Sequence, residues 1–256
     1  MKVLRAMSWV SLAALLVLGN AGRVQAASSL SYNWTGLYLG LHVGNGWGNG
    51  DMGVTPLPSA ATFVNLKPSI EHPTVIGPVG GGQVGFNWQR GRLVLGAETD
   101  FSGCAMGGDD TVHPIVQNNG TPFPGPANHL TTHQDTKWIG TLRPRVGVTV
   151  TPNVLLYGTG GLAYGHVRYS ANTDFRTAGT EQYPAAFSKT KKGWTVGAGV
   201  ECAIASRWTV KTEYLYYNLG HESVLANPVP PLPPFQVGYD WKTTASLVTI
   251  GLNFKF

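Results

Sequence analysis

Hydrophobic and polar residues alternate along much of the chain, a period-two pattern that predicts β-strands. The closing stretch, Thr243 to Phe256, places Val248, Ile250 and Leu252 on one face and mostly small or polar residues on the other. Seven further segments are strand-like, and they begin at Trp34, Gly80, Arg92, Lys137, Val154, Gly193 and Trp208. The pattern therefore predicts eight strands, although the facing of the fifth, from Val154, stays ambiguous.

The connections between these strands alternate between short and long. Tight turns are expected at Gln89–Arg92, Thr151–Asn153 and Ala205–Arg207, where hairpin turn residues occur. The four other connections are long, and they run over residues 47–78, 102–136, 170–191 and 219–239. Short turns on one rim and long loops on the other are typical of a bacterial outer-membrane barrel.

In such a barrel the apolar face of each strand points to lipid, and the face rich in glycine, threonine and charge points inward. The sheet must close, because every backbone donor inside a bilayer needs a partner. Aromatic residues such as Trp34, Trp138, Trp194 and Trp241 are expected to form girdles at the membrane interfaces. Pro144 removes one ladder donor, so a β-bulge is expected there.

The first 26 residues predict a secretory signal. Lys2 and Arg5 precede an apolar run, and small side chains at 24–26 suit a signal peptidase. Residues 27–256 would then form one outer-membrane barrel domain. The formal net charge of +5 falls to about +2 once Lys2, Arg5 and Arg23 are removed, since 15 basic residues then face 13 acidic ones. This balance gives little reason to expect nucleic-acid binding.

Cys104 and Cys202 would lie in an oxidising compartment after export. The strand assignment places them near opposite ends of the molecule. Because a disulfide needs Cα atoms within about 7 Å, we expect no bridge between them.

Several motifs resemble the small immunogenic outer-membrane proteins of Gram-negative bacteria, relatives of the opacity-protein and OmpA-type barrels. The matching stretches include "NWTGLYLGLHVGNGWG", "GGQVGFNWQ", "TLRPRVGVTVTPNVLLYGTGGLAYG" and the terminal "VTIGLNFKF". This resemblance implies an all-β fold, an eight-stranded antiparallel up-and-down transmembrane barrel in the cell outer membrane. It also implies that Phe254 and Phe256 belong to the signal that the barrel-assembly machinery recognises.

Charged residues on the inward faces are the most informative candidate set. They are Glu98, Asp100, Arg143, Arg145, Glu201, Lys211 and Glu213. Acidic and basic side chains on neighbouring strands can pair across the lumen, and an eight-stranded barrel is just wide enough for side chains to fill it. A structural network of ion pairs is therefore the favoured interpretation, and a narrow ion path is the alternative.

Two other groups of residues were considered for chemistry. His221 and Ser223 lie two residues apart, as a lipid-modifying barrel enzyme would require, but no third partner is evident. His113, His129 and His133 share one long loop and could bind a metal, but the loop is rich in Pro and Gly and a solvated loop is the favoured interpretation. We therefore expect no enzyme activity, no cofactor and no metal site.

The expected function is structural, with exposed antigenic loops that contribute to surface interactions and envelope integrity. A small-solute or ion channel is the alternative, and a lipid-modifying enzyme is less favoured. The expected partners are outer-membrane lipid and lipopolysaccharide, the barrel-assembly machinery, and a host or phage ligand at the loops.

Overall fold

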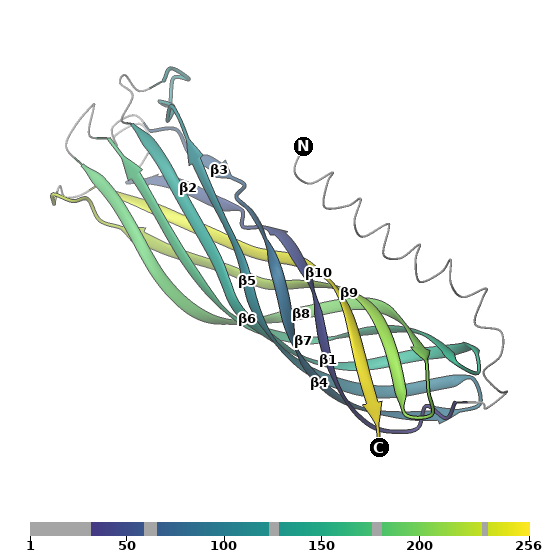
Figure 1. Cartoon of the computed structure of the whole chain (residues 1–256). Helices are drawn as coiled ribbons and strands as arrows, with labels where there is room; N and C mark the ends of the chain where they lie inside the picture. Colours follow the sequence, from purple (N-terminus) through teal and green to yellow (C-terminus); the bar gives the residue numbers. More distant parts are fainter. Residues whose placement is uncertain (1–31, 59–65, 123–127, 176–180, 232–234) are drawn as a thin grey trace.

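The computed structural model describes residues 32–58, 66–122, 128–175, 181–231 and 235–256, and these form one antiparallel sheet closed into a barrel (Figure 1). Its strands are β1 (Gly36–Asn49), β2 (Met52–Leu57), β3 (Ser69–Glu71), β4 (Thr74–Arg90), β5 (Leu93–Val112), β6 (His129–Thr151), β7 (Val154–Asp174), β8 (Gln182–Ala203), β9 (Trp208–Ala226) and β10 (Gln236–Lys255). The proposed signal, residues 1–26, lies outside the described residues. Within the described part of the chain, no helix is long and apolar enough to span a bilayer.

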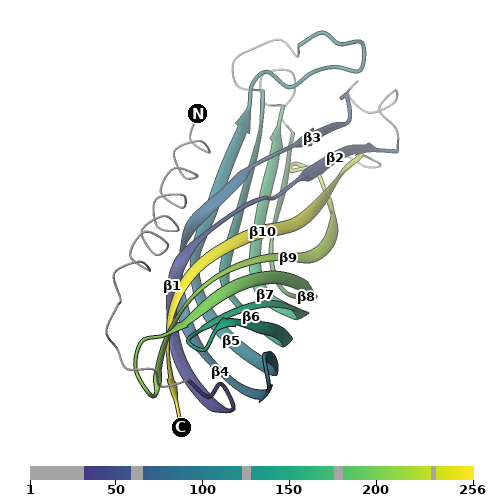
Figure 2. The same ribbon diagram turned by 90° about the vertical axis from the view of Figure 1, so that its right-hand side faces the viewer.

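Eight strands make the closed ring, which confirms the fold expected from the sequence. The order is β1-β4-β5-β6-β7-β8-β9-β10, and β1 pairs back onto β10, with Leu41 opposite Leu252. The short strand β2 replaces β1 as the neighbour of β10 beyond Asn49, and β3 pairs with β2. Figure 2 shows β2 and β3 at the end of the barrel away from the C-terminus.

The expected facing of the strands is confirmed in the half of the barrel nearest the C-terminus. Leu41, Val43, Phe86 and Val146 are all at least 50% exposed, and Leu162 resolves the ambiguous strand β7 by also facing outward. We call this half the membrane section: it runs from the short turns to the outward-facing rings of Trp138 and Trp194. Its apolar outer surface is what contact with hydrocarbon requires.

The strands continue well beyond their predicted ends. β5 extends to Val112 and β6 begins at His129, although a loop had been expected over residues 102–136. The other three long loops are shortened in the same way by β4, β7, β8, β9 and β10. We call this continuation of the barrel beyond the membrane section the extension.

The membrane section and the extension differ in the polarity of their inner and outer surfaces. Along β5 the buried positions change from Glu98 and Asp100 to Cys104 and Met106, while the exposed positions change from Phe101 to polar or small residues. The alternation keeps its phase along β5 and β10, whereas β6 changes phase at a register shift between Thr136 and Trp138. An apolar core therefore lies inside the extension. Because the outward residues there are polar or small, the sequence pattern predicts the end of each strand too early.

Two pairs of neighbouring strands separate from each other in the extension. The ladder between β4 and β5 ends at Ile76 opposite Gly107, and that between β8 and β9 ends at Trp194 opposite Asn218. Beyond these points, β3 and the outer end of β5 have no ladder between them among the described residues, and neither do the outer ends of β8 and β9.

Two expectations about particular residues were wrong. Pro144 causes no bulge, because its pairing with Ala97 keeps the register of β5 and β6 and its ring faces outward. Trp34 and Trp241 are not girdle residues: each is at most 2% exposed and lies inside the barrel. Both tryptophans occupy inward positions near the strand ends, where inward apolar residues close the lumen.

Cys104 and Cys202 are both free, as expected. Cys104 is buried in the core of the extension, whereas Cys202 lies opposite Val154 beside a short turn.

Candidate functional site

The seven charged residues predicted to face inward all lie together in the lumen of the membrane section. They are Glu98, Asp100, Arg143, Arg145, Glu201, Lys211 and Glu213, and none is more than 8% exposed. β5, β6, β8 and β9 supply them at alternate positions, which is why all seven side chains point to the barrel axis. Three basic groups face four acidic groups, so nearly every charge can be paired.

Arg143 is the centre of this network. Its Nη2 atom donates to Glu98 Oε1 at 2.9 Å and to Asp100 Oδ2 at 2.8 Å, and its Nη1 atom donates to Glu213 Oε2 at 2.5 Å. The Nε atom reaches Thr141 Oγ1 at 2.8 Å. One guanidinium thus joins three carboxylates from two strands, which is the geometry that arginine allows and lysine does not.

Lys211 and Arg145 complete the network on either side. Lys211 Nζ lies 2.7 Å from Glu98 Oε1 and 3.3 Å from Glu213 Oε1. Arg145 Nη2 donates to Glu201 Oε2 at 2.7 Å. Because each buried charge has an opposite charge within hydrogen-bonding distance, the network avoids the large cost of an isolated charge in a low-dielectric interior.

Two tyrosines belong to the same network and were missed from the sequence. Tyr38 donates its hydroxyl proton to Glu98 Oε2 at 2.7 Å, and Tyr157 donates to Glu213 Oε1 at 2.9 Å. The Arg145 guanidinium also lies 3.9 Å from the ring centre of Tyr157. Their inward positions on β1 and β7 are the signal that could have identified them.

Further layers fill the lumen above and below the charges. Toward the short turns, Tyr32, Trp34, Val94, Leu155 and Tyr157 form a small apolar cluster. On the other side lies a hydrogen-bonded polar layer made of His42, Gln83, Ser102 and Asn253. The void beside the network measures about 10 Å³, at the lower limit of the roughly 10–15 Å³ that one water needs.

Aromatic side chains fill the extension. The Trp241 ring centre lies 5.5 Å from that of Tyr169 and 5.3 Å from that of Phe187. Lys191 is the buried cation here: its Nζ donates to Gly220 O at 3.1 Å across the parted β8 and β9. Burial lowers the pKa of Lys191 below the ordinary lysine value and raises the pKa of Tyr169 to about 12.

The candidate pair His221 and Ser223 does have a third neighbour, Asp240 on β10. Ser223 donates to Asp240 Oδ2 at 2.7 Å, and His221 Nδ1 lies 3.3 Å from Asp240 Oδ1. The carboxylate therefore sits between the histidine and the serine, whereas a catalytic triad places the histidine between the other two. These three side chains lie on the outer surface of the extension, in β9 and β10.

The three histidines of the second loop are divided between two places. His113 and His129 have ring centres 5.0 Å apart, whereas His133 contacts Asp109 and, at 3.0 Å, Asp135. Burial, the largest influence, lowers the pKa of His133, but hydrogen bonds and charge from the two aspartates together raise that pKa above the ordinary value. Within the described residues no group of three or more His, Cys, Asp or Glu side chains has an arrangement that could hold a metal ion.

The two terminal aromatics lie at the rim of the short turns. The Phe254 ring packs against those of Trp208 and Phe256, with centres 5.0 and 5.3 Å apart. The backbone of Phe256 donates to Leu37 O at 3.0 Å, so the last residue is joined to the first strand.

Comparison with known proteins identifies relatives across nearly the whole chain. A family model described as the outer membrane protein beta-barrel domain matches residues 11–256. The 31 kDa outer-membrane immunogenic protein of Brucella melitensis biotype 1 is 35% identical over 250 residues, which cover 96% of this chain and 93% of that protein. The 22 kDa outer membrane protein of Rhizobium leguminosarum bv. viciae is 38% identical over 185 residues, covering 69% and 66%. The solved outer membrane protein OprG of Pseudomonas aeruginosa covers 89% of this chain and 99% of its own, with 13% identity and a TM-score of 0.48.

Proposed function

The chain belongs to the outer-membrane β-barrel family, and on this basis we propose that it is a closed barrel with a structural and surface-interaction role. In this role the membrane section anchors the protein and strengthens the envelope. The extension holds the loops away from the lipid surface, where they are available to antibodies, to host molecules or to phage. The Brucella relatives are named immunogenic proteins, which is consistent with exposed loops.

The filled lumen is the observation that carries the proposal. Arg143, Arg145 and Lys211 are each at most 3% exposed and are held by carboxylates on several strands. Ions could pass only if these pairs separated, and separating a buried pair costs several kcal/mol, about 3–5 when one partner is removed. The apolar core of the extension adds a second obstruction. These features favour an anchor over the alternative, a narrow ion or solute channel.

Among the residues that the structure describes, the contacts of His221 and Ser223 do not support the third hypothesis, a lipid-modifying enzyme. His221 and Ser223 both contact Asp240 on a solvent-exposed surface, so the histidine is not placed to take the serine proton. The proposed role therefore includes no enzyme activity. Its partners are the lipid and lipopolysaccharide around the barrel, the barrel-assembly machinery, which would recognise Phe254 and Phe256, and a ligand at the loops.

Planar-bilayer recording tests whether the lumen conducts. We expect the purified mature protein to give no stable stepwise current. The matched variant Arg143→Met removes the central cation and should raise the frequency of transient openings, whereas Lys189→Met, on the exposed part of β8, should not. Stable steps from the wild-type protein that change in size with Arg145→Met would replace the proposal with the channel.

Labelling of whole cells tests the surface role. A cysteine at Asn118, exposed beyond β5, should react with a membrane-impermeant maleimide in intact cells. A cysteine at Ser206, in a short turn, should react only after the outer membrane is opened. The parent chain for both should carry Cys104→Ser and Cys202→Ser. Equal labelling of both positions in intact cells, or labelling of Ser206 alone, would contradict the proposed orientation.

A further inference from the structure

A cavity of about 310 Å³ lies in the extension between β3 and the outer end of β5, which are not paired with each other over the residues that the structure describes. Two loop segments border the cavity, and backbone hydrogen bonds hold them together. Leu66 forms a bridge with Gln117, and the amide of Lys67 donates to Val116 O at 3.0 Å. Paired backbone thus borders the space on the side of these two loop segments.

The interior of this cavity is mainly apolar. Leu66, Ile115 and Leu130 line it and are each no more than 4% exposed, with Val112 and Val116 beside them. The volume lies at the lower end of the roughly 300–1,000 Å³ typical of small-molecule sites. At about 30 Å³ for each water, it holds the equivalent of about ten waters. A ligand of about that number of non-hydrogen atoms fits.

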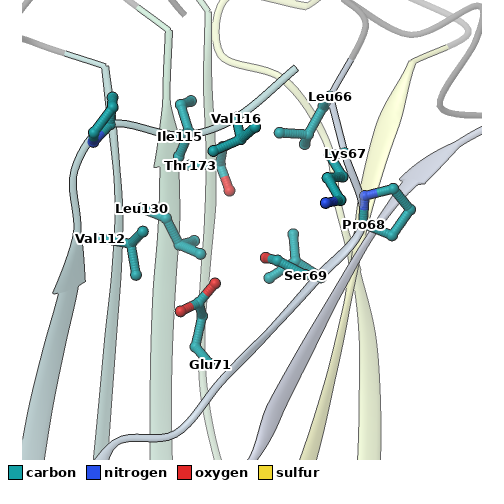
Figure 3. Close-up of a pocket in the computed structure, with 12 residues that line it drawn as sticks. Leu66, Lys67, Pro68, Ser69, Glu71, Val112, Ile115, Val116, Leu130 and Thr173 are labelled. Carbon is teal, nitrogen blue, oxygen red and sulfur yellow. The ribbon is translucent and has the colours of Figure 1, made fainter. Parts of the chain in front are cut away.

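Two opposite charges stand at the edge of the apolar space. Lys67, Ser69 and Glu71 occupy alternate positions along one segment, so all three side chains share a face. Figure 3 shows the Lys67 ammonium and the Glu71 carboxylate directed into the space in front of Ile115, Val116 and Leu130. Among the described residues, neither charge forms an ion pair, although Arg143 and Glu98 show how readily this protein pairs charges elsewhere.

We propose that this cavity binds a small zwitterion with an apolar side chain, namely a free α-amino acid. Its carboxylate is held by Lys67 and its ammonium by Glu71, and its side chain enters the recess formed by Ile115, Val116 and Leu130. A purely apolar ligand would leave both charges without a partner, and a glycine-like ligand would leave the recess empty. This site is independent of the surface role proposed above.

Calorimetry on the mature barrel in detergent micelles tests the proposal with L-leucine and L-methionine as probes. At least one should bind. 4-Methylpentanoate lacks the ammonium, leucinol lacks the carboxylate and glycine lacks the side chain, so each should bind at least tenfold more weakly. Failure of both zwitterionic probes to bind the folded wild-type protein, or binding of leucinol and 4-methylpentanoate as tight as that of L-leucine, would overturn the proposal.

Variants locate the binding. Lys67→Met and Glu71→Gln should each weaken zwitterion binding at least tenfold, whereas Lys192→Met, an exposed change on β8 away from the cavity, should leave it unchanged. Heat-modifiable gel migration shows whether each variant is folded. Val116→Asp provides a second measurement, because it places a charge in the apolar recess while keeping both the Lys67 and the Glu71 side chains, and it should also weaken binding. Wild-type affinity in the folded Lys67→Met/Glu71→Gln double variant would place binding elsewhere and refute the site.

Discussion

The membrane section and the extension are built from the same strands, yet they bury opposite kinds of side chain. β10 shows the difference along a single strand: Asn253 and Thr249 face inward near the turns, whereas Trp241, Tyr239 and Val237 face inward at the far end. The backbone and its alternation do not change. What differs is the surroundings outside the barrel, because hydrocarbon requires apolar outward residues and water does not.

This difference means that the two halves are stabilised in different ways. Inside the membrane section, specific charge pairs must be complete, since a buried charge without a partner is very unfavourable. Inside the extension, burial of apolar area supplies the free energy, as it does in a soluble protein. The following changes test this contrast, from the largest expected effect to the smallest.

Arg143→Ala should produce the largest loss. It leaves Glu98, Asp100 and Glu213 with one fewer cation in a buried site, and removing one partner of such a network costs about 3–5 kcal/mol. Urea unfolding in lipid vesicles measures the change, with Lys137→Ala, on the outer surface, as the control. A loss below about 1 kcal/mol would show that the network contributes little to stability.

Trp241→Ala should also cost about 3–5 kcal/mol, but the damage should stay in the extension. The reason is that the membrane section has its own interior, so the extension can open locally while the ring remains closed. Hydrogen exchange followed by mass spectrometry should show faster exchange in 236–242 and unchanged exchange in 246–254. Uniformly faster exchange would mean that the two halves unfold as one unit.

Arginine placed at outward positions of β5 should distinguish the part of the strand that faces lipid from the part that faces water, because the loss of stability differs. Ala97→Arg lies in the membrane section, where an outward arginine costs about 2–4 kcal/mol near the bilayer centre. Thr111→Arg, exposed in the extension, should change stability by less than about 0.5 kcal/mol. Urea midpoints of the two variants give the comparison directly, and equal midpoints would place the lipid boundary elsewhere.

The smallest effect concerns pH and the outer surface of the extension. The pKa of His133 is raised in the folded state, so its stabilising contribution is complete below the ordinary value of about 6.5 and is lost as the pH rises through the raised value. We expect the stability of the wild type, but not of His133→Gln, to fall slightly over this range. Asp110→Asn leaves the contacts of His133 with Asp109 and Asp135 intact and serves as the control.

Most of the membrane section could be predicted from the sequence, because apolar outward positions and charged inward positions give a strong alternating signal. That signal placed Glu98, Arg143 and Lys211 on a common interior without any knowledge of their partners. It could not show which pairs form, since pairing depends on strand register and on side-chain reach. Tyr38 and Tyr157 were missed because a tyrosine counts as apolar in a hydrophobicity pattern, although its hydroxyl can donate a hydrogen bond.

The extension was not predicted, for a reason visible in particular residues. The inward positions at the start of β6 are Leu130, Thr132, Gln134 and Thr136, and the outward ones are also polar, so the segment looks like a loop. Only the three-dimensional arrangement reveals that Leu130 meets apolar side chains from other strands. The cavity with Lys67 and Glu71 was hidden in the same way, because its walls come from segments far apart in the chain.

The pairing of β1 with β10 has a consequence for how the polypeptide is made. The ring closes through β10, which pairs with β1, and the backbone of Phe256 is bonded to that of Leu37. A chain without β10 would present two unpaired edges, on β1 and on β9, which neither lipid nor a partner strand satisfies. Closure of the ring therefore has to wait until the residues of β10 are synthesised, because they supply both of the last two ladders.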